Sequence, residues 1–144
     1  MAPQMTDKNI NDLDPRLRQS AIDFVNMSTA AIAPSKCVIT VTYRDAKSQN
    51  VAQSLGLSKA TAGHSPHNCV DSNGNPASRG FDFAILGPDG SYVSNGADSR
   101  YETAGKIGKE LGLCWGGDWR METDGCAPDY DHLQMANWKT LAIA

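Results

Sequence analysis

Residues 80–90 read GFDFAILGPDG, and this stretch decides the kind of fold. From Phe81 onward a large apolar side chain occupies every second position, which is the period of a β-strand with one buried face. The turn-forming letters GPDG at 87–90 lead into a second short segment at 91–93, so the stretch predicts a β-hairpin. One carboxylate, Asp82, lies in the middle of this otherwise apolar strand.

Helices and strands are both expected around this hairpin. Asp-Pro at 14–15 supplies the cap and first residue of a helix that runs to about Pro34, and the β-branched run at 37–43 predicts a buried strand that delivers Arg44 at its end. Elements of both kinds along one chain indicate an α+β fold. The other expected elements are helices from Asp45 to Leu55 and from Asp98 to Leu111, and a last strand from Tyr130 to Met135.

Length and composition predict one domain over residues 1–144, with 1–13 as a loosely ordered N-terminal tail. Hydrophobic residues make up 40% of the chain and charged residues 20%, so a sizeable core can form. The formal net charge of -3 gives no electrostatic case for nucleic acid as a partner. The sequence has no apolar run of about 18 residues and no secretory signal pattern, so we expect synthesis in a cytosol and no membrane insertion.

A polar segment without helix or strand periodicity covers residues 56–80. It is dense in Gly, Ser, Asn, Pro and His, and a segment of about 25 such residues within a compact domain is typical of a functional loop. Two of the three histidines of the chain, His64 and His67, lie in it. We therefore expect this loop to contribute to a functional site.

Three residues are unusual for a plain core: His67 in the polar loop, Asp82 in the strand, and His132 in the last strand. Two histidines and one carboxylate are a ligand set of catalytic zinc sites, which leave the fourth position open for water. Asp129, three residues before His132, is placed to shuttle a proton. The alternative is that each histidine is a hydrogen-bonded structural residue.

Acidic residues gather towards the end of the chain. Five carboxylates share a short stretch with one arginine, Arg120, and this density is self-repelling unless a positive charge compensates it. Either a bound cation or the solvation of an acidic loop explains the stretch. The five residues are Asp118, Glu122, Asp124, Asp129 and Asp131.

Four motifs surround the candidate residues. In chain order they are SPH at 65–67, GFDF at 80–83, WGGDW at 115–119 and DYDHLQ at 129–134. Their order resembles the S-x-H, A/G-x-D-F, W-G-G-D-W and D-x-x-H-x-Q pattern of zinc peptidases of peptidoglycan. That family includes D-alanyl-D-alanine carboxypeptidases, vancomycin-resistance dipeptidases and the L-alanyl-D-glutamate endopeptidases that phages use as endolysins.

The resemblance covers roughly residues 15–135. Upstream, TYR at 42–44, QN at 49–50 and GLS at 56–58 are similar to the G-Y-R, Q-N and G-x-S segment of the same family. It implies a small antiparallel sheet flanked by helices, with the zinc site on the sheet, as in the Hedgehog and D,D-peptidase folds.

The resemblance also implies roles for individual residues. His67, Asp82 and His132 would bind one zinc ion, and Asp129 would be the general base that activates the attacking water. Arg44 would stabilise the developing oxyanion, because a guanidinium keeps its charge. Four further residues would support the site. Ser65 and Asp118 would orient ligands, or else are an ordinary turn serine and turn aspartate. Gln49 would lie behind the site or contact the substrate, and His64 would contact the substrate or be a solvated loop residue.

The spacing of two implied ligands departs from the family pattern. Six residues commonly separate the first histidine from the aspartate, whereas fourteen separate His67 from Asp82. The turn formers at 71–76 indicate a surface excursion within the inserted segment 68–81. The same stretch imitates the start of an EF-hand calcium loop that would end at Asp82, although Pro76 lies where that loop needs glycine.

Cysteine and tryptophan leave alternatives open. The four cysteines form no C-x-x-C pair, so buried free thiols are the default for Cys37, Cys69, Cys114 and Cys126. A bridge between Cys69 and Cys126 after release into an oxidising periplasm is a second hypothesis. Trp115, Trp119 and Trp138 are candidates for a substrate groove, with core packing expected for at least one of them.

The expected activity is zinc-dependent hydrolysis of the L-Ala-D-Glu bond in peptidoglycan stem peptides by a monomeric phage or prophage endolysin. Such a protein would wait in the host cytoplasm and act in the periplasm once the membrane is permeabilised. The alternatives are a D,D-carboxypeptidase or dipeptidase on D-Ala-D-Ala, and a non-catalytic zinc or cell-wall binding module.

Overall fold

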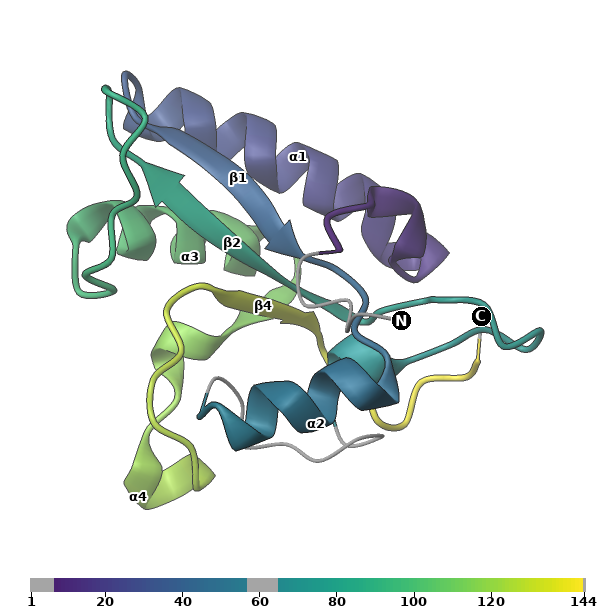
Figure 1. Ribbon diagram of the computed structural model, residues 1–144. Helices are drawn as coiled ribbons and strands as arrows, with labels where there is room; N and C mark the ends of the chain where they lie inside the picture. Colours follow the sequence, from purple (N-terminus) through teal and green to yellow (C-terminus); the bar gives the residue numbers. More distant parts are fainter. Residues whose placement is uncertain (1–6, 57–64, 144) are drawn as a thin grey trace.

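The computed structural model describes residues 7–56 and 65–143 (Figure 1). Four strands form one antiparallel sheet in the order β1-β2-β4-β3, which confirms the expected α+β fold. The strands are β1 (Lys36–Val41), β2 (Gly80–Leu86), β3 (Leu113–Trp115) and β4 (His132–Met135). The helices are α1 (Pro15–Ile32), α2 (Ala46–Ser54), α3 (Ser99–Glu110) and α4 (Met121–Asp124), with short 3-10 helices η1 (Ile10–Asp12), η2 (Pro66–Asn68) and η3 (Gly116–Asp118).

The core lies between one face of the sheet and the helices α1 and α3, which run along the same side of it (Figure 1). Phe81, Phe83 and Ile85 of β2 are fully buried there. Phe24 of α1 packs against both phenylalanines, with ring centroids 5.6 and 4.9 Å apart. Because successive strand residues point to opposite faces, Asp82 emerges on the face away from these helices.

Most expected elements end within two residues of their predicted bounds. The last strand begins at His132 and not at Tyr130, and the second arm of the hairpin is reduced to a single bridge between Leu86 and Tyr92. Strand β3 was not expected, since three residues are too few to show a two-residue period.

The described part of the N-terminal segment, residues 7–13, contacts the segments that follow it. Leu13 is fully buried and forms a parallel bridge with Ser78. The backbone N–H of Thr42 donates to the carbonyl oxygen of Asp7. These contacts attach residues 7–13 to the rest of the domain.

Two arginines hold the C-terminal segment. Arg79 donates hydrogen bonds to the carbonyl oxygens of Leu141 and Ala142 at 3.0 and 2.8 Å, and Arg16 donates to Ala142 at 2.8 Å. Asp14, which is fully buried, lies 2.8 Å from the guanidinium of Arg16 and 3.5 Å from Nε of Arg79. One carboxylate therefore forms ion pairs with both guanidinium groups.

Candidate metal centre

His67, Asp82 and His132 converge on the sheet face opposite the core. One possible ligand atom from each lies within 4.8 Å of the others. Oδ1 of Asp82 is 3.3 Å from Nε2 of His67 and 2.9 Å from Nδ1 of His132. Both histidines are about 5% exposed, so the three groups form a compact and largely buried cluster. The zinc ligands implied by the resemblance are thus brought together.

Local structure explains how each residue reaches this point. Asp82 on β2 pairs directly with His132 on β4, and paired residues of neighbouring strands point to the same face. His67 lies on η2, where the hydroxyl of Ser65 accepts a hydrogen bond from the His67 backbone N–H at 3.2 Å. Ser65 therefore caps the turn that carries His67, as an ordinary turn serine does.

Each imidazole is also held through the ring nitrogen that does not face Asp82. Nδ1 of His67 is 2.8 Å from the carbonyl oxygen of Thr42, and Nε2 of His132 is 2.9 Å from Oε1 of Gln134. Such contacts set the tautomer of a ligating histidine. Neither Thr42 nor Gln134 was expected at the site from the sequence, although Gln134 belongs to the last of the four motifs.

Charge is concentrated within the cluster. Burial alone would raise the pKa of Asp82, but the adjacent imidazoles of His67 and His132 outweigh burial and hold that pKa well below its ordinary value. Burial also disfavours a charged His132, yet the hydrogen bond and charge of Asp82 raise the pKa of His132 to about 9. The carboxylate is therefore ionised and ready to bind a cation.

Arg44 borders the cluster. Its side chain is nearly buried, and Nη2 lies 3.8 Å from Oδ2 of Asp82. Nη1 donates to Oε1 of Gln49 at 3.1 Å, and the Arg44 backbone is tied to η2 by bonds to His67 and Asn68. The guanidinium is thus held beside the ligands by α2 and η2, with Gln49 directly behind it.

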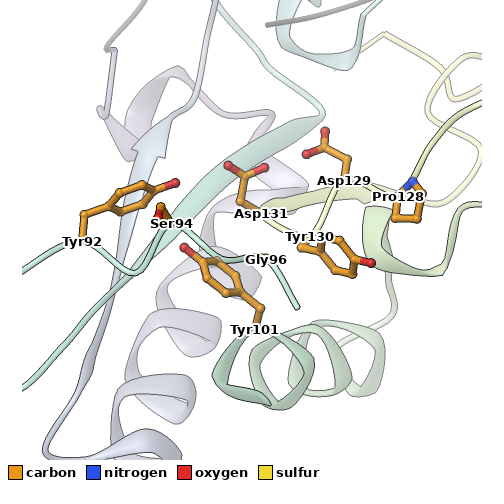
Figure 2. Close-up of a pocket in the computed structure, with 8 residues that line it drawn as sticks. All are labelled: Tyr92, Ser94, Gly96, Tyr101, Pro128, Asp129, Tyr130 and Asp131. Carbon is orange, nitrogen blue, oxygen red and sulfur yellow. The ribbon is translucent and has the colours of Figure 1, made fainter. Parts of the chain in front are cut away.

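A cavity of about 210 Å³ opens at the start of β4 (Figure 2). Asp129 and Asp131 line it, and their carboxyl groups point to the same side in Figure 2. Burial, a hydrogen bond to Asp129 and the nearby charges of Asp82 and Asp129 together raise the pKa of Asp131 to about 8. Asp131 had no predicted role beyond the acidic stretch. The other lining residues are Tyr92, Ser94, Gly96, Tyr101, Pro128 and Tyr130.

The glycine pair of WGGDW allows close packing against the segment that carries Asp129. A Cβ on Gly116 would lie 2.3 Å from the carbonyl oxygen of Asp129, whose own N–H donates to the Gly116 carbonyl at 2.9 Å. A Cβ on Gly117 would lie 2.2 Å from the ring of Trp115. Only glycine fits these two positions without a shift of the neighbours.

The tryptophans divide between core and site. Trp115 is 7% exposed, belongs to the core and donates its indole N–H to the carbonyl oxygen of Tyr130 at 2.9 Å. Trp119 is half-buried, and its ring centroid lies 5.4 Å from that of His132. Trp138 is half-buried within the C-terminal segment. The expectation that at least one tryptophan packs in the core is confirmed.

Of the expected site residues that the structure describes, Asp118 does not join the cluster. The carboxylate of Asp118 is 51% exposed and lies 3.0 Å from Nζ of Lys109 on α3, so it forms a surface ion pair and does not orient a metal ligand. His64 lies outside the described residues. Glu122 and Asp124 are exposed, so this part of the acidic stretch is solvated.

The excursion between His67 and Asp82 closes on itself. Oδ1 of Asp71 accepts the backbone N–H groups of Asn73 and Asn75 at 2.8 and 2.9 Å. Asp82, the last ligand that an EF-hand reading would need, instead faces His67 and His132. The calcium interpretation is therefore wrong, and the longer spacing leaves the convergence of the two residues intact.

The cysteines form no disulfide. All four are free: Cys37 is buried, Cys69 is half-buried, and Cys114 and Cys126 are exposed. Burial raises the pKa of the Cys37 thiol to about 12, which makes it unreactive. The hypothesis of a bridge between Cys69 and Cys126 is not supported.

The cluster fits a zinc ion. Two imidazoles and one carboxylate match the donors of catalytic zinc sites. The nitrogens of His67 and His132 that face away from Asp82 already have acceptors, so in the neutral imidazoles the lone pairs lie on the nitrogens that face Asp82. These nitrogens can bind a cation once the proton that Asp82 stabilises on His132 has been released.

The comparisons with known proteins agree with this geometry. No family model matches the chain. The sequence is 31% identical over 140 residues to the peptidoglycan L-alanyl-D-glutamate endopeptidase CwlK of Bacillus subtilis, covering 87% of this chain and 74% of that protein. The chain belongs to the zinc peptidoglycan peptidase family. It is accordingly a peptidase that acts on peptidoglycan.

Solved structures show the same fold for this peptidase. The L-Ala D-Glu endopeptidase ChiX of Serratia marcescens superimposes with a TM-score of 0.58 at 16% identity, covering 92% of this chain and 87% of that one. The LD-carboxypeptidase LdcB gives the same score and identity, covering 88% and 67%. None of the described helices of the peptidase is long and apolar enough to cross a membrane.

Proposed function

We propose that the peptidase hydrolyses the amide bond between L-alanine and D-glutamate in peptidoglycan stem peptides, with one zinc ion as cofactor. The observation that carries this proposal is the convergence of His67, Asp82 and His132 within 4.8 Å on one sheet face. The 31% sequence identity to CwlK, whose name specifies this bond, supports the choice of substrate.

The residues around the cluster have complementary roles in amide hydrolysis. When bound, zinc would polarise the scissile carbonyl and lower the pKa of water at its open position. Asp129 takes the proton from the attacking water and delivers it to the leaving nitrogen. Arg44 faces the negative charge that develops on the carbonyl oxygen, and Gln49 holds the guanidinium in place through its 3.1 Å hydrogen bond.

The wider role that we propose is that of a phage or prophage endolysin, on the basis of the resemblance to phage endopeptidases. The protein would be a monomer that is made in the host cytoplasm and reaches the cell wall in the periplasm after membrane permeabilisation. Added to outer-membrane-permeabilised Gram-negative cells, it should clear the suspension. If the suspension stayed turbid although purified peptidoglycan was cleaved, the lytic role would be contradicted and the hydrolytic activity would stand.

Mass spectrometry of digested peptidoglycan tests metal, reaction and bond together. Purified Gram-negative peptidoglycan is incubated with the protein, with a chelator, and with zinc restored after chelation. We expect stem peptides with a free N-terminal glutamate, which disappear on chelation and return with zinc.

Other digestion products identify the alternatives. Release of free D-alanine in place of these peptides would favour a carboxypeptidase, the activity named for the structural neighbour LdcB. Unaltered muropeptides in the presence of zinc would overturn hydrolysis and favour a non-catalytic binding module.

Gly116→Ala should lower kcat between about 10- and 100-fold, because the added methyl group displaces Asp129 from its position. Gly117→Ala is the matched comparison, since its methyl group meets Trp115 and should cost mainly stability. Steady-state kinetics and thermal unfolding of both variants separate the two effects. An unchanged kcat for Gly116→Ala would show that the close approach to Asp129 has no catalytic importance.

A further inference from the structure

Both ring nitrogens of His132 have a defined partner. Nδ1 lies 2.9 Å from Oδ1 of Asp82, and Nε2 lies 2.9 Å from Oε1 of Gln134. An amide oxygen accepts hydrogen bonds and does not donate them. The Gln134 contact therefore requires a proton on Nε2, and in a neutral imidazole this leaves the lone pair on Nδ1, the atom that faces Asp82.

The two histidines of the cluster are oriented by different kinds of group. His67 turns its Nδ1 to the backbone carbonyl of Thr42 and directs Nε2 towards Asp82. His132 turns its Nε2 to a side chain, that of Gln134, and directs Nδ1 towards Asp82. The Gln134 contact can therefore be removed by substitution, whereas the Thr42 contact belongs to the main chain.

The strand arrangement holds Gln134 where it can act on His132. The two residues are two positions apart on β4, so their side chains lie on the same face. Gln134 pairs with Gly80 of β2 on one side and with Cys114 of β3 on the other. Its backbone is thus fixed by both neighbouring strands.

We infer that Gln134 is a positioning residue that keeps Nε2 of His132 protonated and Nδ1 aimed at the metal. This inference rests on the proposed zinc site. Without the amide oxygen, the Nδ1–H tautomer, which donates to Asp82 and cannot bind a metal, competes with the ligating form. Gln134 therefore contributes to metal affinity without touching the metal.

The test is the zinc affinity of the full chain, measured by competition with a chromophoric chelator. Gln134→Met keeps the length of the side chain but removes the acceptor, and it should weaken zinc binding roughly 10- to 100-fold. Gln134→Glu keeps an acceptor and should bind zinc as tightly as the wild type or more so. Gln53→Met, on the exposed surface of α2, is the matched control and should change nothing.

A second measurement distinguishes positioning from a general structural effect. Long-range ¹H–¹⁵N correlation spectra of the zinc-loaded wild type should show His132 protonated at Nε2, and thermal unfolding of metal-free Gln134→Met should match that of the metal-free wild type. Equal zinc affinity of Gln134→Met and the wild type, or a proton on Nδ1, would overturn the inference and leave the zinc site intact. Absence of zinc binding by the wild type would overturn the proposed function as well.

Discussion

Asp129→Asn is expected to lower kcat by roughly 10²- to 10⁴-fold while the protein still binds one zinc ion. The amide keeps the shape of the side chain but cannot take a proton from water. Asp129 is exposed and lines the cavity near the start of β4. Steady-state kinetics on a stem-peptide substrate and the zinc content of the same preparation give the two readouts.

Asp131 is the competing candidate for the base, and the structure distinguishes the two carboxyl groups. Asp131 is half-buried, whereas Asp129 is exposed, and burial, the hydrogen bond to Asp129 and the nearby charges of Asp82 and Asp129 raise the pKa of Asp131, which favours its protonated form. A protonated carboxyl group cannot act as the base. Asp131→Asn replaces one neutral group by another and should reduce kcat less than tenfold, well below the range of a general base.

Glu122→Gln is the matched control for both substitutions, because Glu122 is an exposed carboxylate of the same acidic stretch and lies on α4. It should leave kcat and zinc content unchanged. A large loss in Asp131→Asn with normal turnover in Asp129→Asn would reverse the two roles.

Asp14→Asn should destabilise the fold by about 3 kcal/mol or more, since it leaves the nearly buried guanidinium of Arg79 without its counter-charge. Asparagine is about as good a helix N-cap as aspartate, so the variant removes the charge and keeps the cap of α1. Asp14→Ala should lose about 1 kcal/mol more, because the cap is removed as well. Urea unfolding at pH 7 measures both values.

Asp98 supplies the matched control for this experiment. It caps α3 in the same way and pairs with Arg100 at 2.9 Å, but its side chain is 24% exposed. Exposed ion pairs contribute little to stability, so Asp98→Asn should show only a small fraction of the loss. Equal losses at the two sites would contradict the importance of burial.

The pH dependence of the Asp14 contribution has a definite sign. Burial would raise the pKa of Asp14, but the hydrogen bonds and charge of Arg16 and the charge of Arg79 lower it below its ordinary value. The unfolded state then binds more protons at acid pH, so this contribution is complete above about pH 4 and is lost as the pH falls through the folded-state pKa. The difference between wild type and Asp14→Asn should therefore be constant from pH 5 to 7 and shrink below about pH 4.

Much of the candidate site could be predicted because its signals are local. The alternation around Asp82 placed this carboxylate on the face opposite Phe81 and Phe83, and the motifs singled out His67 and His132. The contacts behind the ligands could not be predicted. Examples are the hydrogen bond of His67 to Thr42 and the contact of the Asp131 carboxyl group with Asp129. Both depend on how the chain packs in three dimensions, and no local pattern encodes such packing.

The caps of α1 and α3 show where the sequence stops being sufficient. Asp14-Pro15-Arg16 and Asp98-Ser99-Arg100 each specify an aspartate that accepts the arginine backbone N–H at 2.9 Å and pairs with the same side chain. This geometry involves three consecutive residues, so the sequence by itself determined it. Only the tertiary structure decided that Asp14 is buried against Arg79 while Asp98 stays exposed, because burial depends on which distant segments cover a residue.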